Sequence, residues 1–174
     1  MPILSPQQVS VRPVAAAFPG LIGDITNLGT GEVIASGAPS WPPENAFDNI
    51  VSWASSWWSE QPASADTYIG WDWVTARPRI RRATCRRAWN QSNNSAWPAT
   101  LALEISDNLA TWIEIGRIEG LSRPPADSYD ATPVVIDVAE PIPARAARLR
   151  MAALSGNVGY GTNIVEAEFI ENLE

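Results

Sequence analysis

The residues best suited to chemistry gather between positions 43 and 60, in the stretch PENAFDNIVSWASSWWSE. No helical or strand period fits this stretch, so we expect an ordered loop. Asp48, surrounded by loop carbonyls and serine hydroxyls, suits a hard cation such as calcium. Trp53 and Trp57 offer aromatic faces of the kind that stack on a sugar ring. The loop therefore predicts both a metal site and a carbohydrate contact.

Two later loops combine aromatic and amide side chains in the same way. The polar run NQSNNS, residues 90–95, is flanked by tryptophans, and the glycine-rich run SGNVGYGTN covers residues 155–163. An amide has one donor end and one acceptor end, which suits neighbouring sugar hydroxyls. The ligand contacts predicted from these two loops are Trp89, Asn90, Asn93, Trp97, Asn157 and Tyr160.

The composition narrows the class of partner. A chain of 174 residues can form one domain with its own core. Its net charge of -7 argues against nucleic acid as a partner. Every basic residue is an arginine, and half of the arginines lie between Arg77 and Arg87. Alternation along a strand predicts that these form either a charged face paired with neighbouring acids or an anion-binding surface.

Catalysis has little support in the sequence. Histidine, the commonest general base and metal ligand, is absent. No nucleophile, phosphate-loop or zinc motif occurs, and the single cysteine, Cys85, excludes an internal disulfide. Glu166 and Glu168 lie two apart on one strand face, a common surface arrangement rather than a glycosidase pair. We expect no enzymatic activity.

Residues 1–31 differ from the rest of the chain. They are rich in proline and glycine and contain one arginine and one aspartate. We expect an extended N-terminal arm, either wrapped on the domain of residues 32–174 or docked on a larger assembly. The arm has no basic region typical of a signal peptide, and its apolar run is too short to span a membrane. We therefore expect cytoplasmic synthesis, with release as part of a virion or phage-like particle.

From residue 67 onward the pattern is one of short strands and turns. Runs at 67–74, 79–89, 100–106, 111–118, 133–138, 146–152 and 164–170 alternate or are rich in β-branched and aromatic residues. In residues 100–106, Leu101, Leu103 and Ile105 are predicted to point inward and Glu104 outward. In the last run, Val165, Ala167 and Phe169 are predicted to share one face. The pattern favours an all-β sandwich or barrel.

The ordered motifs ENAFD (44–48), YIGWDW (68–73), LALEISDNLATW (101–112), ARAARLRM (144–151) and IVEAEF (164–169) resemble the coagulation factor five/eight type C, or discoidin, domain. This domain belongs to the galactose-binding-like group, which includes bacterial carbohydrate-binding modules. The resemblance covers about residues 33–171 and implies a jelly-roll β-sandwich of about eight antiparallel strands.

The resemblance also implies functional residues. A structural calcium would be held by Asp48, by Ser52 or Ser56 with nearby carbonyls, and by Glu166. The binding rim would use the loops named above, with Tyr160 as its late-loop aromatic and Arg86 or Arg87 as its arginine; we assign Arg87. The histidine usual in galactose-binding members is absent.

Three hypotheses follow for the function. The first is a non-catalytic carbohydrate-binding module that recognises cell-surface glycan or capsular polysaccharide, carried on a phage-like fibre or spike. The second is a structural or protein-docking subunit of a larger particle, attached through residues 1–31. The third is a membrane-surface binder that inserts Trp57 and Trp58.

Overall fold

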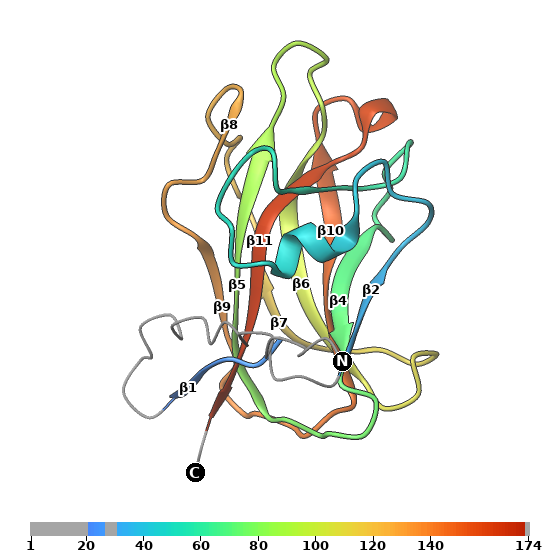
Figure 1. The fold of residues 1–174 in the computed structure, drawn as a ribbon, viewed down its shortest axis with the longest axis vertical. Helices are drawn as coiled ribbons and strands as arrows, with labels where there is room; N and C mark the ends of the chain where they lie inside the picture. Colours follow the sequence, from blue (N-terminus) through green and yellow to red (C-terminus); the bar gives the residue numbers. More distant parts are fainter. Residues whose placement is uncertain (1–20, 27–30, 173–174) are drawn as a thin grey trace, which may run out of the picture.

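The computed structural model describes residues 21–26 and 31–172, which form a sandwich of two antiparallel sheets (Figure 1). The helical elements in this described part are two 3₁₀ turns, η1 Pro43–Phe47 and η2 Val158–Tyr160. The predicted all-β class is confirmed. None of the described residues forms a helix long and apolar enough to cross a membrane.

The described strands outnumber the predicted ones, because four short strands left no clear sequence pattern. One sheet has six strands in the order β1-β11-β5-β8, with β3 also paired to β11 and β9 also paired to β5. Its bounds are β1 Leu21–Asp24, β3 Trp57–Trp58, β5 Ile80–Trp89, β8 Ser128–Tyr129, β9 Val134–Asp137 and β11 Asn163–Asn172. The second sheet has five strands in the order β2-β4-β10-β6-β7. Its bounds are β2 Glu32–Ala35, β4 Tyr68–Asp72, β6 Trp97–Ser106, β7 Ile113–Ile118 and β10 Ala146–Ser155.

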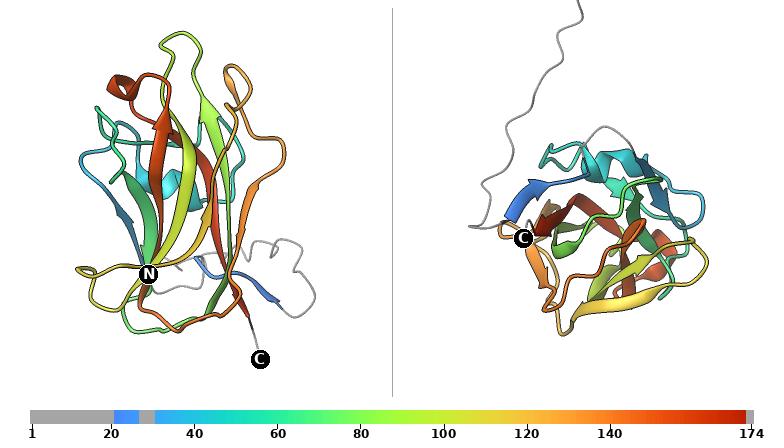
Figure 2. Two further views of the ribbon diagram at one scale, coloured as in Figure 1. Left: turned by 180° about the vertical axis from the view of Figure 1, so that it is seen from behind. Right: turned by 90° about the horizontal axis from the view of Figure 1, so that it is seen from below.

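The hydrophobic core lies between the two sheets, which Figure 2 shows end-on. Leu101, Leu103 and Ile105 of β6 are inside, as their spacing of two predicted. Ala83 and Cys85 supply the same face of β5. Burial of these apolar side chains is the main favourable contribution to folding.

Strand β11 departs from the predicted alternation. Ile164, rather than Val165, joins Ala167 and Phe169 in the core. The cause is a change of register against β5 between Ile164 and Glu166. Such an irregularity adds a residue to one strand and reverses the phase of the side chains before it.

The outer face of β6 is also not as predicted, because Glu104 is only 6% exposed. Arg148 and Arg150 of β10 each reach this carboxylate at 2.6 Å. The guanidinium of Arg148 in turn lies over the rings of Tyr68 and Trp112, at 4.5 and 4.1 Å from their centroids. Polar partners and aromatic rings thus bury a glutamate that alternation alone placed in water.

Different parts of the chain lie at the two ends of the sandwich. The β5–β6 and β10–β11 connections lie at the top of Figure 1, whereas Leu21 pairs with Asn172 near the bottom. Residues 21–26 of the predicted arm belong to the sandwich, since β1 pairs with β11 and Ile25 is 1% exposed in the core. The rest of the predicted arm, residues 1–20 and 27–30, lies outside the described residues.

Candidate functional site

Three loops meet at the top of the sandwich: residues 52–61, 90–96 and 156–161 (Figure 1). We call their joint surface the rim. The backbone N–H of Asn157 donates to the carbonyl of Asn94 at 2.9 Å, which joins the second and third loops. The indole N–H of Trp58 donates to the carbonyl of Tyr160 at 2.6 Å, which joins the first and third. The rim is therefore one connected surface.

A glycine allows the first and third loops to approach so closely. Gly161 has a φ of +74°, and a Cβ at this position would lie 2.8 Å from Nε1 of Trp58. Any other residue would be strained in this conformation and would push the ring away. Trp58 also contacts Trp41 and Trp53 edge to face, at centroid distances of 5.7 and 6.3 Å.

Six predicted ligand residues reach the surface of the rim. Tyr160 is 44% exposed and Asn157 is also exposed, while the other four are half-buried: Trp53, Asn90, Asn93 and Trp97. They come from all three loops, so the structure brings together residues that are more than 100 positions apart in the chain. An aromatic ring and several amides now share one surface.

The amides of the rim are arranged so that their nitrogen ends remain available. Oδ1 of Asn90 accepts from the backbone and hydroxyl of Ser92, at 3.0 and 2.6 Å. Oδ1 of Asn93 accepts from the Ser95 amide at 3.2 Å, and Oδ1 of Asn157 from the Gly159 amide at 3.1 Å. Within the described chain, no hydrogen bond engages Nδ2 of the three asparagines. Their oxygens hold the turns, and their N–H groups can donate to a ligand.

Three of the predicted ligand contacts are wrong as surface contacts. Trp57, Trp89 and Arg87 are 0, 4 and 3% exposed. Trp57 packs into the core because β3 pairs with β11 and turns this ring inward, while Trp58 faces the rim loops. The loop sequence alone gave no sign of which tryptophan would turn inward.

Arg87 is a buried structural residue rather than a ligand contact. Nε donates to Oδ2 of Asp130 at 2.8 Å, and Nη2 donates to Oδ1 at 3.2 Å. Nη1 donates to the carbonyls of Pro98 and Ser122, at 2.9 and 3.0 Å. Because Pro98 belongs to the other sheet, this side chain links the two sheets beneath the rim. A charge buried to this extent needs such a full set of partners.

Sequence reasoning missed Arg123, which lies beside the rim. Its guanidinium is 4.2 Å from the ring centroid of Trp89 and 5.9 Å from that of Trp97. The two tryptophans pack edge to face at 6.3 Å. Nothing in the local sequence SRPPADSY signalled this contact, which depends on how the β7–β8 connection folds back.

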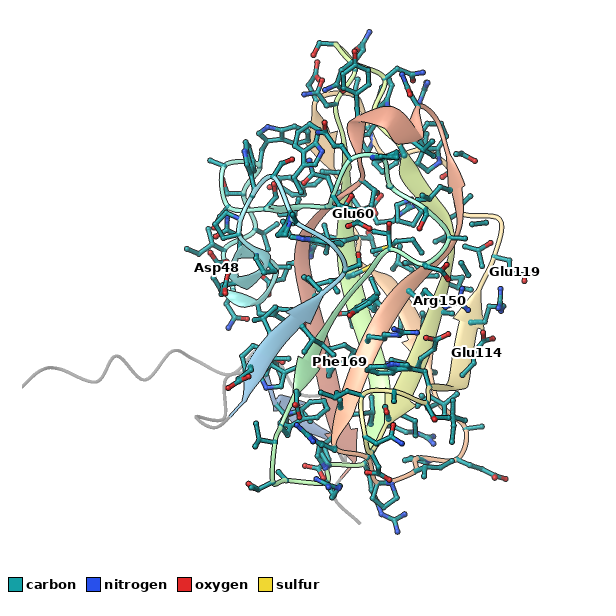
Figure 3. All side chains as sticks on the ribbon, turned by 90° about the vertical axis from the view of Figure 1, so that its right-hand side faces the viewer. Asp48, Glu60, Glu114, Glu119, Arg150 and Phe169 are labelled. Atoms are coloured by element: carbon teal, nitrogen blue, oxygen red, sulfur yellow. The ribbon has the colours of Figure 1, made fainter. Side chains whose placement is uncertain are left out.

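The predicted metal ligands lie on the outer side of the six-stranded sheet, below the first loop. Figure 3 shows Asp48 on one side of the molecule and Arg150 on the other. Asp48 accepts from the Ile50 amide at 2.8 Å and from the Ser55 hydroxyl. The Ser56 hydroxyl donates to the carbonyl of Trp53 at 3.0 Å. These bonds fold the loop tightly over strand β11.

Glu166 is the distinctive group of this region. It is 5% exposed, and neither carboxylate oxygen has a hydrogen bond of normal geometry among the described residues. Burial raises the pKa of Glu166 to about 9, and the negative charge of nearby Asp48 acts in the same direction. An opening of about 110 Å³ is lined by Glu166 with Glu168 and Arg86.

The donor set fits a hard cation in part. An unpartnered buried carboxylate next to a second carboxylate is the arrangement that a bound cation would neutralise. The described residues contain no group of three or more acidic, histidine or cysteine side chains able to hold a metal. Backbone carbonyls or hydroxyls of the loop must therefore complete any coordination.

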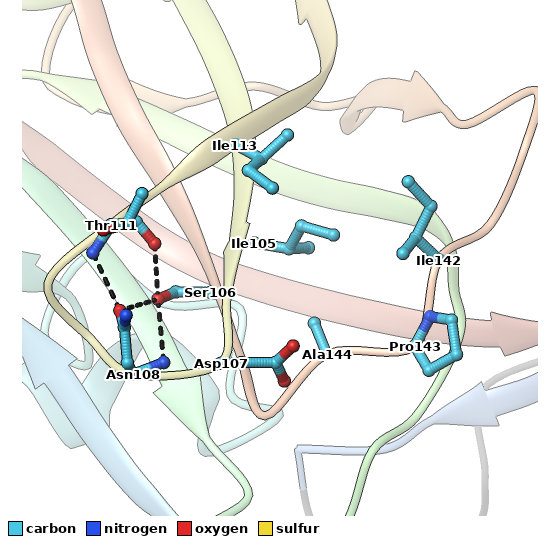
Figure 4. Close-up of a pocket in the computed structure, with 9 residues that line it drawn as sticks. All are labelled: Ile105, Ser106, Asp107, Asn108, Thr111, Ile113, Ile142, Pro143 and Ala144. Atoms are coloured by element: carbon cyan, nitrogen blue, oxygen red, sulfur yellow. Dashed lines mark hydrogen bonds between the residues drawn. The ribbon is translucent and has the colours of Figure 1, made fainter.

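A pocket of about 180 Å³ lies at the opposite end of the sandwich (Figure 4). Ile113 and Ile142 line it and are 58 and 46% exposed. Ser106 and Thr111 also line it, and the Ser106 hydroxyl donates to the Thr111 carbonyl at 2.7 Å. The sequence patterns did not indicate this apolar opening.

No family model matches the chain, and no curated protein matches it. Solved structures do match. One is the C-terminal domain of a chitobiase from Bacteroides fragilis, at TM-score 0.60 and 17% identity, covering 84% of this chain and 97% of that one. Another is the F5/8 type C domain of a Bacteroides fragilis protein, at TM-score 0.57 and 12% identity, covering 83 and 93%.

A third match is a family 32 carbohydrate-binding module from Clostridium perfringens, solved in complex with galactose. Its TM-score is 0.54 at 14% identity, covering 82% of this chain and 93% of that one. At such identities the likeness shows the fold. The discoidin-like, galactose-binding-like sandwich that the sequence motifs indicated is therefore the fold of this chain.

Proposed function

We propose that this chain is a non-catalytic carbohydrate-binding module whose ligand sits on the rim. The observation that carries the proposal is the exposed ring of Tyr160 beside three asparagines whose Nδ2 donors are unengaged. The apolar face of a pyranose would pack on the ring, and the amide N–H groups would donate to its hydroxyl oxygens. The solved carbohydrate-binding modules that share this fold support the proposal.

The test is a screen of bacterial polysaccharides, with and without calcium, followed by calorimetry on the Tyr160→Ala and Tyr160→Phe variants. Loss of the ring should weaken binding about tenfold, because its buried apolar area no longer contributes. Tyr160→Phe keeps the ring and should retain most of the affinity. Leu109→Ala, at the far end of the molecule, is the matched control. Silence across the screen, or full binding by Tyr160→Ala, would contradict the proposal.

We also propose a structural calcium beneath the first loop. Asp48 and Glu166 would hold it with loop carbonyls and the Ser56 hydroxyl, and the ion would neutralise the buried carboxylate. The loop carrying Trp53 would then be fixed against β11. Calorimetric titration of chelator-treated protein with calcium should show binding and a raised melting temperature. An unchanged melting temperature would remove the ion from the proposal.

For the biological setting, we propose recognition of cell-surface or capsular polysaccharide by a phage-like fibre or spike. The described chain starts at Leu21 at the end opposite the rim, so an assembly held through the segment before it would leave the rim facing outward. Deleting residues 1–20 should then abolish incorporation into the particle and leave glycan binding intact. Loss of both properties, or of neither, would contradict this setting.

A protein-docking subunit without glycan binding is the second candidate. The observation that favours it is the far-end pocket with its exposed isoleucines, because exposed apolar patches often mark contact sites. Membrane insertion through Trp57 and Trp58 is not supported, since these rings are 0 and 8% exposed. A silent glycan screen combined with particle incorporation that depends on Ile113 and Ile142 would favour docking.

A further inference from the structure

The guanidinium of Arg123 differs from those of the other described arginines. Each of the others donates to a carboxylate or a backbone carbonyl. Arg123 is exposed, and its guanidinium lies over the rings of Trp89 and Trp97. Its N–H donors thus have no oxygen partner within residues 21–26 and 31–172. An arginine with unused donors, held at a defined place, is suited to an anionic ligand.

Stacking fixes the Arg123 guanidinium without using its N–H groups. The planar cation lies 4.2 Å from the Trp89 ring centroid, within the range of an attractive cation–π contact. Such a contact engages the face of the guanidinium and leaves the N–H groups around its edge available. Trp89 is 4% exposed and is held in turn by Trp97, so the support under Arg123 is rigid. The position of the Arg123 guanidinium is therefore set by the two tryptophan rings as well as by its own loop.

The cation is continuous with the rim. Trp97, 5.9 Å from the guanidinium, pairs with Ser155, immediately before the third rim loop. The acids nearest in sequence are already engaged: Glu119 pairs with Arg117 at 3.5 Å, Asp127 accepts from the Gln91 amide at 2.8 Å, and Asp130 is paired with Arg87. No local carboxylate neutralises Arg123, even though the net charge of the chain is -7.

We propose that Arg123 gives the rim a preference for acidic glycans by binding the carboxylate of a hexuronate unit. This rests on the proposed carbohydrate-binding function. The forked donors of an arginine match the two oxygens of a carboxylate, which a neutral sugar does not offer. Neighbouring hydroxyls of the same glycan would accept hydrogen bonds from the amides of the rim. Arg123 thus sets the class of glycan, and Tyr160 with the asparagines supplies contacts common to many sugars.

The experiment compares acid and ester forms of the same polymers on the full chain. Polygalacturonate, alginate and hyaluronan, each with its methyl-esterified form, are tested by affinity electrophoresis and calorimetry. Wild-type protein should bind at least one acid form about tenfold more tightly than its ester, which corresponds to ~1.4 kcal/mol. Arg123→Gln should reduce this preference to less than about twofold and leave the affinity for the ester unchanged. Arg123→Lys should keep part of it, because the charge remains without the fork.

Arg79→Gln is the matched control. It removes one exposed positive charge directly before β5, at the end of the sandwich opposite the rim. It should leave the acid preference intact. Equal binding of acid and ester by the wild type, or a preference that survives Arg123→Gln, overturns the role of Arg123 while the module function stands. No binding to any polymer, acid or ester, counts against both the inference and the proposed function. Tryptophan fluorescence verifies that the Trp89–Trp97 packing persists in each variant.

Discussion

The outer faces of the two sheets each bury one glutamate, and they treat it in opposite ways. Glu104, on β6 of the five-stranded sheet, is 6% exposed and receives Arg148 and Arg150 at 2.6 Å. Glu166, on β11 of the six-stranded sheet, is 5% exposed and forms no ion pair or well-formed hydrogen bond among the described residues, although Arg86 lines the same opening. The two carboxylates have the same chemistry and the same exposure, and they differ only in their partners.

This difference separates a structural group from a candidate site. A buried carboxylate is costly unless it is paired, so evolution of a stable fold disfavours one left alone. The two arginines and the rings of Tyr68 and Trp112 complete the environment of Glu104. Glu166 has no ion pair of that kind among the described residues, and burial, with the negative charge of Asp48 acting in the same direction, raises its pKa to about 9. Burial of a carboxylate does not by itself indicate a binding site, whereas burial of a carboxylate without a partner makes it a candidate.

The largest expected effect comes from removing the charge of Glu104, which is paired with two arginines. Glu104→Gln should lower the free energy of unfolding by about 3 kcal/mol, since two half-buried arginines lose their shared counter-charge. Denaturant unfolding measures the change directly. A loss below about 0.5 kcal/mol would show that the pairs behave as surface ion pairs, and the contrast with Glu166 would disappear.

The next effect comes from removing the unpartnered carboxyl of Glu166. In chelator at pH 7, Glu166→Gln should leave the stability unchanged or raise it by about 1 kcal/mol, because folding must protonate the lone buried carboxyl, whose pKa is about 9, and the amide avoids that cost. With calcium, wild-type protein should gain about 2.7 kcal/mol at a hundredfold excess over the dissociation constant, and the variant should gain almost nothing. Parallel unfolding curves with and without calcium provide the measurement. Equal calcium responses in both proteins would mean that Glu166 does not bind the ion.

Strands β6 and β10 show which features of the fold could be predicted from the sequence. Alternation placed Leu101, Leu103 and Ile105 correctly, because a strand residue's face depends on local spacing. It placed Glu104 in water because its partners lie 44 and 46 positions away on β10. No local pattern contains such a contact.

The candidate site shows the same limit. The motifs identified the loops that form the rim, and Tyr160 with the asparagines does lie on its surface. The fate of the aromatic and charged residues within those loops depended on pairing that is not local. Trp57 turns inward because its strand pairs with β11, and Arg87 is buried because Asp130 and the Pro98 carbonyl meet it there. The contact of Arg123 with Trp89 joins residues 34 positions apart, so no local pattern indicated it.

The smallest effect tests an intermediate case, a buried carboxylate with one arginine. Asp72 is 3% exposed and accepts from Nε and Nη2 of Arg145, at 2.9 and 2.6 Å. The Arg145 hydrogen bonds hold the pKa of Asp72 below its ordinary value of 3.8, with the Val74 amide and the charge of Arg77 acting in the same direction. Arg145→Gln should lower the free energy of unfolding at pH 7 by less than the loss at Glu104, because Arg145 is partly solvated.

The sign of the pH dependence follows from the lowered pKa. Stability from this pair is fully present above pH 3.8, the ordinary pKa, and is lost as the pH falls through the lower folded value. The difference between wild type and Arg145→Gln should therefore shrink as the pH falls through the lowered pKa of Asp72, because protonation removes the charge that Arg145 pairs with. Urea unfolding at pH 7, 4 and 2 gives the three points needed. A difference that stays constant would assign the effect to packing of the Arg145 stem, and the rule that partners decide the role of a buried carboxylate would then fail for Asp72.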